Sequence, residues 1–157
     1  MTPDQQDQAL TIAADFMARD GIEGVRLKPY ACPAGVATVG IGSTVYEDGR
    51  RVTLLDPPIT RERAVALCAH HLRKRCLPVI LKHCPELDTP RRLAAVLSFC
   101  YNVGEGHLEA STMRHAINRR AWDDAAVGLK LWNKANGRIL AGLVNRRRLE
   151  AEMLVSG

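Results

Sequence analysis

Residues 25–55 break the pattern of the rest of the chain, and this break constrains the fold most strongly. The segments "VATVGIG" (36–42) and "RRVTLL" (50–55) are β-prone, and the turn signals "CPAG" and "YEDGR" lie among them. On both sides of this region, apolar residues recur at helical spacing. Strands confined to one region of a mainly helical chain predict an α+β protein with a small antiparallel sheet of two or three strands.

The flanking segments predict helices with recognisable ends. Residues 3–19 carry an apolar stripe and close at Gly21. Downstream, Thr60 is expected to cap a helix that runs to about residue 76, and a shorter helix ends near Cys84. Thr89 and the proline after it begin a helix that Gly104 stops. Three more helices are expected, namely a short one capped by Ser111, then 121–131 and 139–154.

The size of the chain suits one compact domain, because 157 residues bury a sizeable core. We expect a single domain over 1–157, with a β lobe at about 23–58 and a larger helical lobe at about 60–157 that includes the N-terminal helix 3–19. A cleft between these two lobes is the natural place for a ligand.

The chain is basic, with a net charge of +5, which favours an anionic partner such as nucleic acid, a membrane surface or a cell-wall polymer. No apolar run approaches the about 18 residues that span a bilayer. No lysine or arginine precedes the apolar segment 9–18, as it would in a secretory signal. We therefore expect no stable membrane insertion and a chain that stays in the cytoplasm after synthesis.

Cysteine and histidine spacing gives no metal site. There are five cysteines and no C-x-x-C pair, which disfavours a zinc ribbon. Cys68 and His71 have helical spacing, but no third ligand follows them at that spacing. We expect neither a metal nor another cofactor, and we expect four of the cysteines to be small buried hydrophobic residues: Cys68, Cys76, Cys84 and Cys100.

The β-prone region holds a candidate site. If Pro33 to Gly35 turn the chain, Cys32 and Thr38 point to the same side of a hairpin as diagonal neighbours. Glu23 enters from the end of the first helix, just before the sheet. Gly40 and Gly42 continue on the face of Thr38 and would let a ligand or another backbone approach closely. The spacing alone is explained more simply by a solvated glutamate, a β-forming threonine and a core cysteine.

Three ordered blocks resemble the phage-type lysozymes (endolysins) of glycoside hydrolase family 24. The first runs through "EGVRLKPY" and "GVATVGIGST" and matches the spacing of Glu23, Cys32 and Thr38. The second is "LSFCYNVGEGHLEAST" (97–112), which is similar to the central helix and following loop of the family. The third is "WNKANGRILAGLVNRRRLEAEML" (132–154), with its Trp, Gly-Leu and Arg-Arg-x-x-Glu positions. The resemblance implies a lysozyme-like fold of two lobes.

The resemblance also implies an activity, which is cleavage of the β-1,4 bond between N-acetylmuramic acid and N-acetylglucosamine in peptidoglycan. Glu23 matches the general acid, and such an acid needs cover from substrate or apolar neighbours to hold a proton near neutral pH. Most relatives carry Asp where this chain has Cys32, and a minority carry Cys. Cys32 is then a thiolate base, a nucleophile, or a residue that shapes the site while Thr38 positions water. The Asp-bearing relatives resemble inverting enzymes, but with Cys32 in place of Asp the resemblance does not imply the configuration of the product.

The resemblance adds candidate substrate-binding residues in both lobes. Asn102 and Ser111 could hydrogen-bond sugar groups, although helix termination and capping also explain them. Arg146 and Arg147 match the Arg-Arg block, and one of them could pair with Glu23; a solvated helix face, or a pair of Arg146 with Glu150, is the alternative. The full set of expected substrate-binding residues is Tyr30, Gly40, Gly42, Asn102, Ser111, Arg146 and Arg147.

The partner implied is the glycan strand of peptidoglycan, bound by a monomer. A catalytically weakened peptidoglycan-binding module of the same fold is the alternative if Cys32 marks lost catalysis. Nucleic acid is disfavoured, because few aromatic residues are present and no known reading motif occurs. By resemblance, the enzyme stays in the host cytoplasm until a membrane pore made by another protein releases it to the periplasm.

Overall fold

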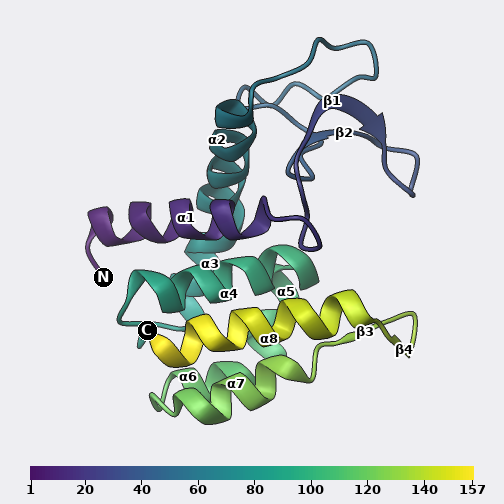
Figure 1. Cartoon of the computed structure of the whole chain (residues 1–157). Coiled ribbons are helices and arrows are strands. Elements are labelled where there is room, and N and C mark those ends of the chain that lie inside the picture. Colours follow the sequence, from purple (N-terminus) through teal and green to yellow (C-terminus); the bar gives the residue numbers. More distant parts are fainter. The chain divides into compact units, whose positions relative to one another are not determined.

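The computed structural model describes residues 1–157 and is mainly helical (Figure 1). The chain forms two compact units, residues 14–71 and residues 1–13 with 72–157. The helices are α1 (Pro3–Met17), α2 (Arg61–His71), α3 (Leu77–His83), α4 (Pro90–Val103), α5 (Glu105–Ala110), α6 (Thr112–Ile117), α7 (Trp122–Lys130) and α8 (Ala141–Ser156), with a π-helical segment η1 (Leu72–Cys76) between α2 and α3.

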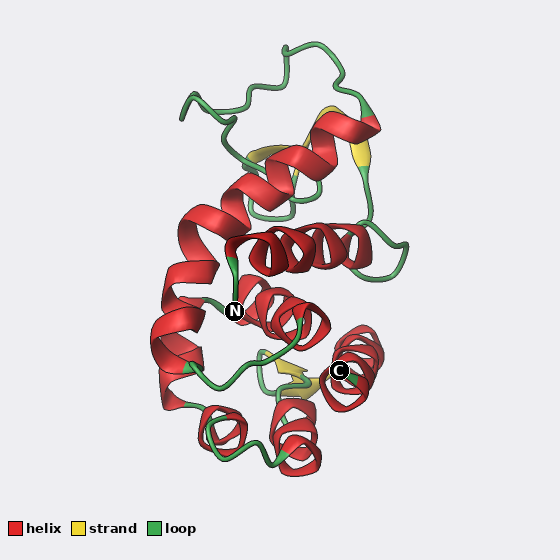
Figure 2. Cartoon of the chain, turned by 90° about the vertical axis from the view of Figure 1, so that its left-hand side faces the viewer, coloured by secondary structure: helices red, strands yellow, loops and turns green.

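Strands are confined to two short hairpins, which Figure 2 shows in yellow. Strands β1 (Arg26–Ala31) and β2 (Ala37–Gly40) form the first, and β3 (Lys134–Ala135) and β4 (Arg138–Ile139) form the second. The predicted α+β class with a small antiparallel sheet is therefore confirmed. The expected strand at "RRVTLL" does not form: only Arg51 is bridged, to Val45, and Leu54 and Leu55 are exposed in a turn.

Local sequence signals set most helix ends as expected. The hydroxyl of Thr60 accepts from the Arg63 N–H at 3.1 Å, and that of Thr89 accepts from the Arg92 N–H at 3.2 Å. Helix α4 ends before Gly104, as predicted. Three features were not predicted: the π-helical turn η1, helix α5, which begins directly after Gly104, and the β3–β4 hairpin.

In the unit that contains residues 72–157, α8 packs against α4 and α7, and α6 packs against α7 (Figure 1). Its buried side chains include Leu93, Leu97 and Phe99 of α4. Across the two units, four cysteines are buried, as predicted, and none of them forms a disulfide: Cys68, Cys76, Cys84 and Cys100. Burial raises the pKa of Cys84 to about 12, so this thiol is neutral and inert at physiological pH.

In the unit of residues 14–71, Asp56 holds the loop that follows β2. Its carboxylate accepts hydrogen bonds from the Tyr46 hydroxyl at 2.8 Å, and from the N–H and hydroxyl of Thr53 at 2.9 and 2.7 Å. These bonds, those from Thr53 first, lower the pKa of Asp56 to about 2. The guanidinium groups of Arg50 and Arg63 lie over the Tyr46 ring, 4.4 and 5.0 Å from its centroid.

Candidate active site

The β1–β2 hairpin brings Cys32 and Thr38 to one face. Tyr30 pairs with Thr38 and Ala31 with Ala37, and the Cys32 N–H donates to the Val36 carbonyl at 3.0 Å. The turn closes with the Gly35 N–H on the Cys32 carbonyl at 2.7 Å, and Gly35 has φ 79°. A three-residue loop that ends in a left-handed residue is a common hairpin connection and favours glycine there. The predicted register is thus confirmed, with Cys32 diagonal to Thr38.

The Cys32 thiol lies among hydrogen-bond donors. The backbone of Val36 contributes most, the backbone of Ala34 comes next, and the Thr38 hydroxyl adds to them; together they lower the pKa of Cys32 below its ordinary value of 9.0. The thiol is half-buried, whereas Thr38 is buried. In the structure the Thr38 hydroxyl donates its single proton to the Val36 carbonyl at 2.9 Å, and rotation would turn it toward an ionised sulfur. These donors therefore stabilise the thiolate relative to the thiol.

Glu23 lies after α1, in the same compact unit as Cys32 and Thr38. Its N–H donates to the Met17 carbonyl at 3.1 Å, in a turn where the N–H of Gly24 also reaches Met17. Gly21 and Gly24 have φ values of 82° and 73°, which only glycine adopts readily. The Glu23 residue is exposed, so the chain's own side chains do not bury it.

The other predicted substrate-binding residues of this unit are Tyr30, Gly40 and Gly42, and each has different neighbours. The Arg26 guanidinium lies 4.3 Å from the centroid of the Tyr30 ring, and Tyr30 shares the face of Thr38. A Cβ on Gly40 would lie 3.2 Å from the Cβ of Ala64, so helix α2 makes the close approach that we expected at Gly40. Gly42 has φ 71° and is half-buried.

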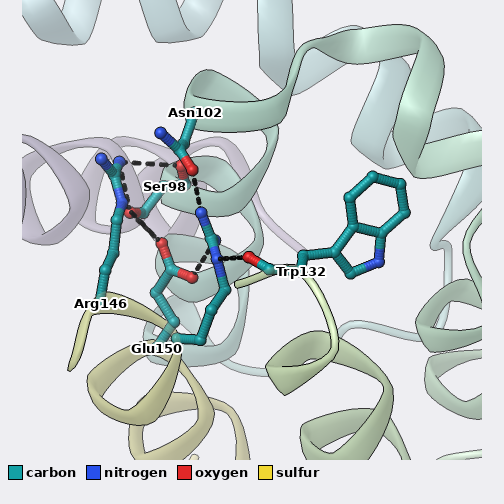
Figure 3. A network of polar contacts seen from close by, with 6 residues as sticks. Ser98, Asn102, Trp132, Arg146 and Glu150 are labelled. Atoms are coloured by element: carbon teal, nitrogen blue, oxygen red, sulfur yellow. Dashed lines mark hydrogen bonds and ion pairs between the residues drawn. The ribbon is translucent and has the colours of Figure 1, made fainter. Parts of the chain in front are cut away.

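Arg146 and Arg147 form the centre of a buried polar network in the other unit (Figure 3). Both guanidinium groups contact Glu150, that of Arg146 through Nε at 3.1 Å. The Ser98 hydroxyl donates to Glu150 at 2.6 Å, and Arg146 also reaches the carbonyl and hydroxyl of Ser98 at 3.1 Å. The solvated face that we considered for this run applies only to Arg148, which is exposed and pairs with Glu152 at 2.6 Å.

Arg147 connects this network to two further candidates. Its guanidinium donates to the Trp132 carbonyl at 3.0 Å and to the Asn102 side-chain oxygen. Because that oxygen accepts from Arg147, the amide NH₂ of the exposed Asn102 is left to face away from the guanidinium. Asn102 and Trp132 line a pocket of about 280 Å³ together with Val103, His107, Lys134, Ala135 and Leu143.

Ser111 has a structural role in the chain. Its hydroxyl donates to the Leu108 carbonyl at 2.7 Å and accepts from the Arg114 N–H at 3.3 Å, and it is buried. It therefore caps α6, as the sequence suggested. The pocket residues His107 and Trp132 were not predicted as site residues; their rings meet edge to face at 5.4 Å. No three His, Cys, Asp or Glu side chains come together in a way that could hold a metal ion.

A mainly helical chain, with a Glu in the turn after the first helix and a Cys and a Thr on the small hairpin that follows, defines a lysozyme-like protein. The phage lysozyme family model matches residues 20–150, and the chain belongs to this family. A SAR-endolysin of Bacteriophage PS34 is 35% identical over 140 residues, which cover 88% of this chain and 79% of that protein.

Solved structures agree with this assignment. A mutant of the phage P22 lysozyme superimposes with a TM-score of 0.81 at 27% identity, covering 91% of this chain and 94% of that one. The muramidase domain of SpmX from Asticaccaulis excentricus gives a TM-score of 0.65 at 26% identity, with 95% of each chain covered. The resemblance inferred from the three sequence blocks is confirmed.

Proposed function

We propose that this chain is a muramidase, which hydrolyses the β-1,4 bond between N-acetylmuramic acid and N-acetylglucosamine. As a member of the phage lysozyme family, the chain functions in peptidoglycan hydrolysis for phage lysis. The observation that carries the finer proposal is the pair of Cys32 and Thr38 on one hairpin face, in one compact unit with Glu23. Residues 1–157 are proposed to act as one lysozyme-like domain, as a monomer.

Glu23 is the proposed general acid. Cleavage of a glycosidic bond needs a proton for the departing oxygen and relief of positive charge at the anomeric carbon. A glycan strand that covers the exposed Glu23 carboxyl would exclude water and favour its protonated form. The acid then gives its proton to the bridging oxygen, and the bond to the anomeric carbon breaks.

Cys32 is the proposed base on the other side of the sugar. The donors of Val36 and Ala34 stabilise its thiolate, and the Thr38 hydroxyl lies beside it. The Cys32 sulfur and the Thr38 hydroxyl can together hold one water molecule through two polar contacts. A nucleophilic Cys32 would attack the anomeric carbon directly and would not need Thr38 for that step. Water attacks the anomeric carbon and loses a proton to Cys32, so the configuration inverts.

The configuration of the first product tests this assignment. Early NMR spectra of cleaved peptidoglycan oligomers should show the inverted anomer at the new reducing end. Retention would overturn the base role and favour a thioglycoside intermediate. In parallel, we expect Cys32→Asp to keep activity, because Asp is a competent base, and Cys32→Ser to lose most of it. Equal activity of both variants would leave Cys32 without a chemical role.

The substrate-binding roles of Tyr30, Gly42 and Asn102 remain proposals. Asn102 is the most specific of these, because Arg147 fixes its amide as an outward donor beside the Trp132 pocket. Asn102→Asp would present an acceptor in place of that donor, and it should raise KM for glycan while kcat changes little. A wild-type chain that binds peptidoglycan without releasing reducing ends would favour the binding-module alternative.

The proposed site of action is the periplasm, where the substrate is, with the chain held in the host cytoplasm until a separate membrane pore releases it. No helix of the structure has both the length and the apolar character that a membrane crossing requires. Expression with and without a pore-forming phage protein tests this route. Lysis should depend on the pore, and lysis by the chain alone would contradict the proposed route.

A further inference from the structure

The β3–β4 hairpin is an exposed projection of the unit that contains α8 (Figure 1). Every residue from 134 to 142 is exposed. Asn136 and Gly137 have φ values of 51° and 75°, which suit a tight two-residue turn. Large apolar side chains lie on and beside this turn: Leu131 is 69% exposed, Ile139 63%, Leu140 45% and Val144 44%.

These side chains lie on one short segment of the chain, residues 131–144. Ile139 pairs with Lys134 across the hairpin, and the Leu140 N–H donates to the Asn133 carbonyl at 3.1 Å. Val144 lies one helical turn beyond Leu140 and donates to its carbonyl at 3.0 Å, so both share a face. We define the hairpin patch as Leu131, Lys134, Arg138, Ile139, Leu140 and Val144.

The segment that carries the hairpin patch has charges of one sign. No acidic residue occurs from residue 125 to residue 149. Lys134 and Arg138 are exposed, as is the nearby Lys130, and none of the three forms an ion pair. Two other surface arginines do have such partners: Arg120 pairs with Glu86 at 2.9 Å and Arg148 with Glu152 at 2.6 Å. The hairpin patch therefore combines exposed aliphatic groups with cations that have no partner in the chain.

We propose that the hairpin patch docks on the surface of a bilayer that contains anionic phospholipid. Aliphatic side chains gain from entering the boundary between head groups and acyl chains, and the adjacent cations gain from anionic head groups. Glycan offers no apolar phase, so it would leave Ile139 and Leu140 without a partner. A second copy of the chain would place its own cations against Lys134 and Arg138, which opposes self-association. The attachment is interfacial and does not involve the catalytic candidates of the β1–β2 hairpin.

Flotation with vesicles of phosphatidylglycerol and phosphatidylethanolamine tests the electrostatic part. Each cation near an anionic surface strengthens binding about fivefold, so Lys134→Ala with Arg138→Ala should weaken it by roughly 30-fold. The matched control, Arg61→Ala with Arg119→Ala, removes the same charge from exposed positions elsewhere and should bind almost as wild type does. Equal weakening by both pairs would show that only net charge matters and would overturn the proposed patch.

The apolar part has its own matched pair. Ile139→Ser with Leu140→Ser should weaken vesicle binding by roughly tenfold or more. Leu54→Ser with Leu55→Ser removes side chains that are 57% and 97% exposed in the other unit, and it should have little effect. Thermal melts that match wild type show that each variant is folded.

Tryptophan fluorescence locates the contact. The chain has two tryptophans, and Trp122→Phe leaves Trp132, at the base of the hairpin, as the single reporter. Addition of the same vesicles should shift its emission to shorter wavelength, and brominated lipids should quench it. Absence of both changes while the protein floats with vesicles would place the contact elsewhere. Equal binding to neutral vesicles, binding only to lipopolysaccharide or to purified sacculi, or dimers through the hairpin patch would each contradict the proposal.

Discussion

Replacing Glu150 by Gln should destabilise the fold severely. The Glu150 carboxylate is fully buried between two guanidinium groups, with Arg147 on one oxygen and Arg146 together with the Ser98 hydroxyl on the other (Figure 3). A Gln amide must present its NH₂ to one of these two sets of donors, whichever way it is turned. On that side, the amide NH₂ faces a guanidinium group that is also a donor, so no hydrogen bond forms. The negative charge of the Glu150 carboxylate, which balances the two arginines, is also lost.

The size of this effect follows from the burial. Breaking a buried ion pair costs about 3–5 kcal/mol, a large share of the about 5–15 kcal/mol by which a domain is stable. For a chain of this length, such a loss lowers Tm by roughly 10 °C. Burial also raises the pKa of Glu150, while the two arginines oppose that rise.

Urea denaturation and thermal melts followed by circular dichroism measure the loss. Glu152→Gln is the matched control, because Glu152 pairs with Arg148 at 2.6 Å on the same helix but is more than half exposed. Exposed pairs of this kind contribute about 0–1 kcal/mol. A loss below about 1 kcal/mol for Glu150→Gln, or a loss equal to that of Glu152→Gln, would refute the reasoning.

Three further predictions concern the unit of residues 14–71 and the buried thiols. Asp56 has a pKa of about 2 against an ordinary 3.8, so it stabilises the folded chain above pH 4 and this contribution is lost as the pH falls toward 2; Asp56→Asn should remove that part of the acid dependence in circular dichroism. Gly40→Ala would place a Cβ 3.2 Å from that of Ala64 at φ 67°, and it should cost about 1–3 kcal/mol in urea melts; an unchanged midpoint would contradict it. Near pH 8, iodoacetamide should modify Cys32 well before Cys84, as peptide mass spectrometry would show, because their pKa values are shifted in opposite directions.

The hairpin that carries Cys32 and Thr38 could be predicted because its signals are local. Pro33 and Gly35 fix the turn, and the period of two then fixes which side chains share a face. Helix caps at Thr60 and Thr89 are equally local. The family could also be identified from three separated blocks, because each block is a continuous stretch of sequence.

The features that could not be predicted depend on distant partners or on very short segments. The buried Arg147 guanidinium contacts Asn102, which lies 45 residues earlier in the chain, and Glu150 on its own helix. Only the contact with Glu150 has a helical spacing that the sequence shows. The Asn136-Gly137 turn is a hairpin signal, but strands of two residues show no alternation. At "RRVTLL", β propensity was overridden because the hydrogen bonds of Thr53 to Asp56 hold the segment as a loop.

The release of reducing ends from purified peptidoglycan by Glu23→Gln, compared with wild type, tests the central claim most directly. Gln keeps the size of the side chain but has no proton of suitable acidity, and general acids contribute about 10²- to 10⁴-fold to the rate. The account predicts that Glu23→Gln keeps the wild-type melting behaviour and loses at least about a hundredfold in rate. A folded Glu23→Gln that cuts as fast as wild type would contradict the account.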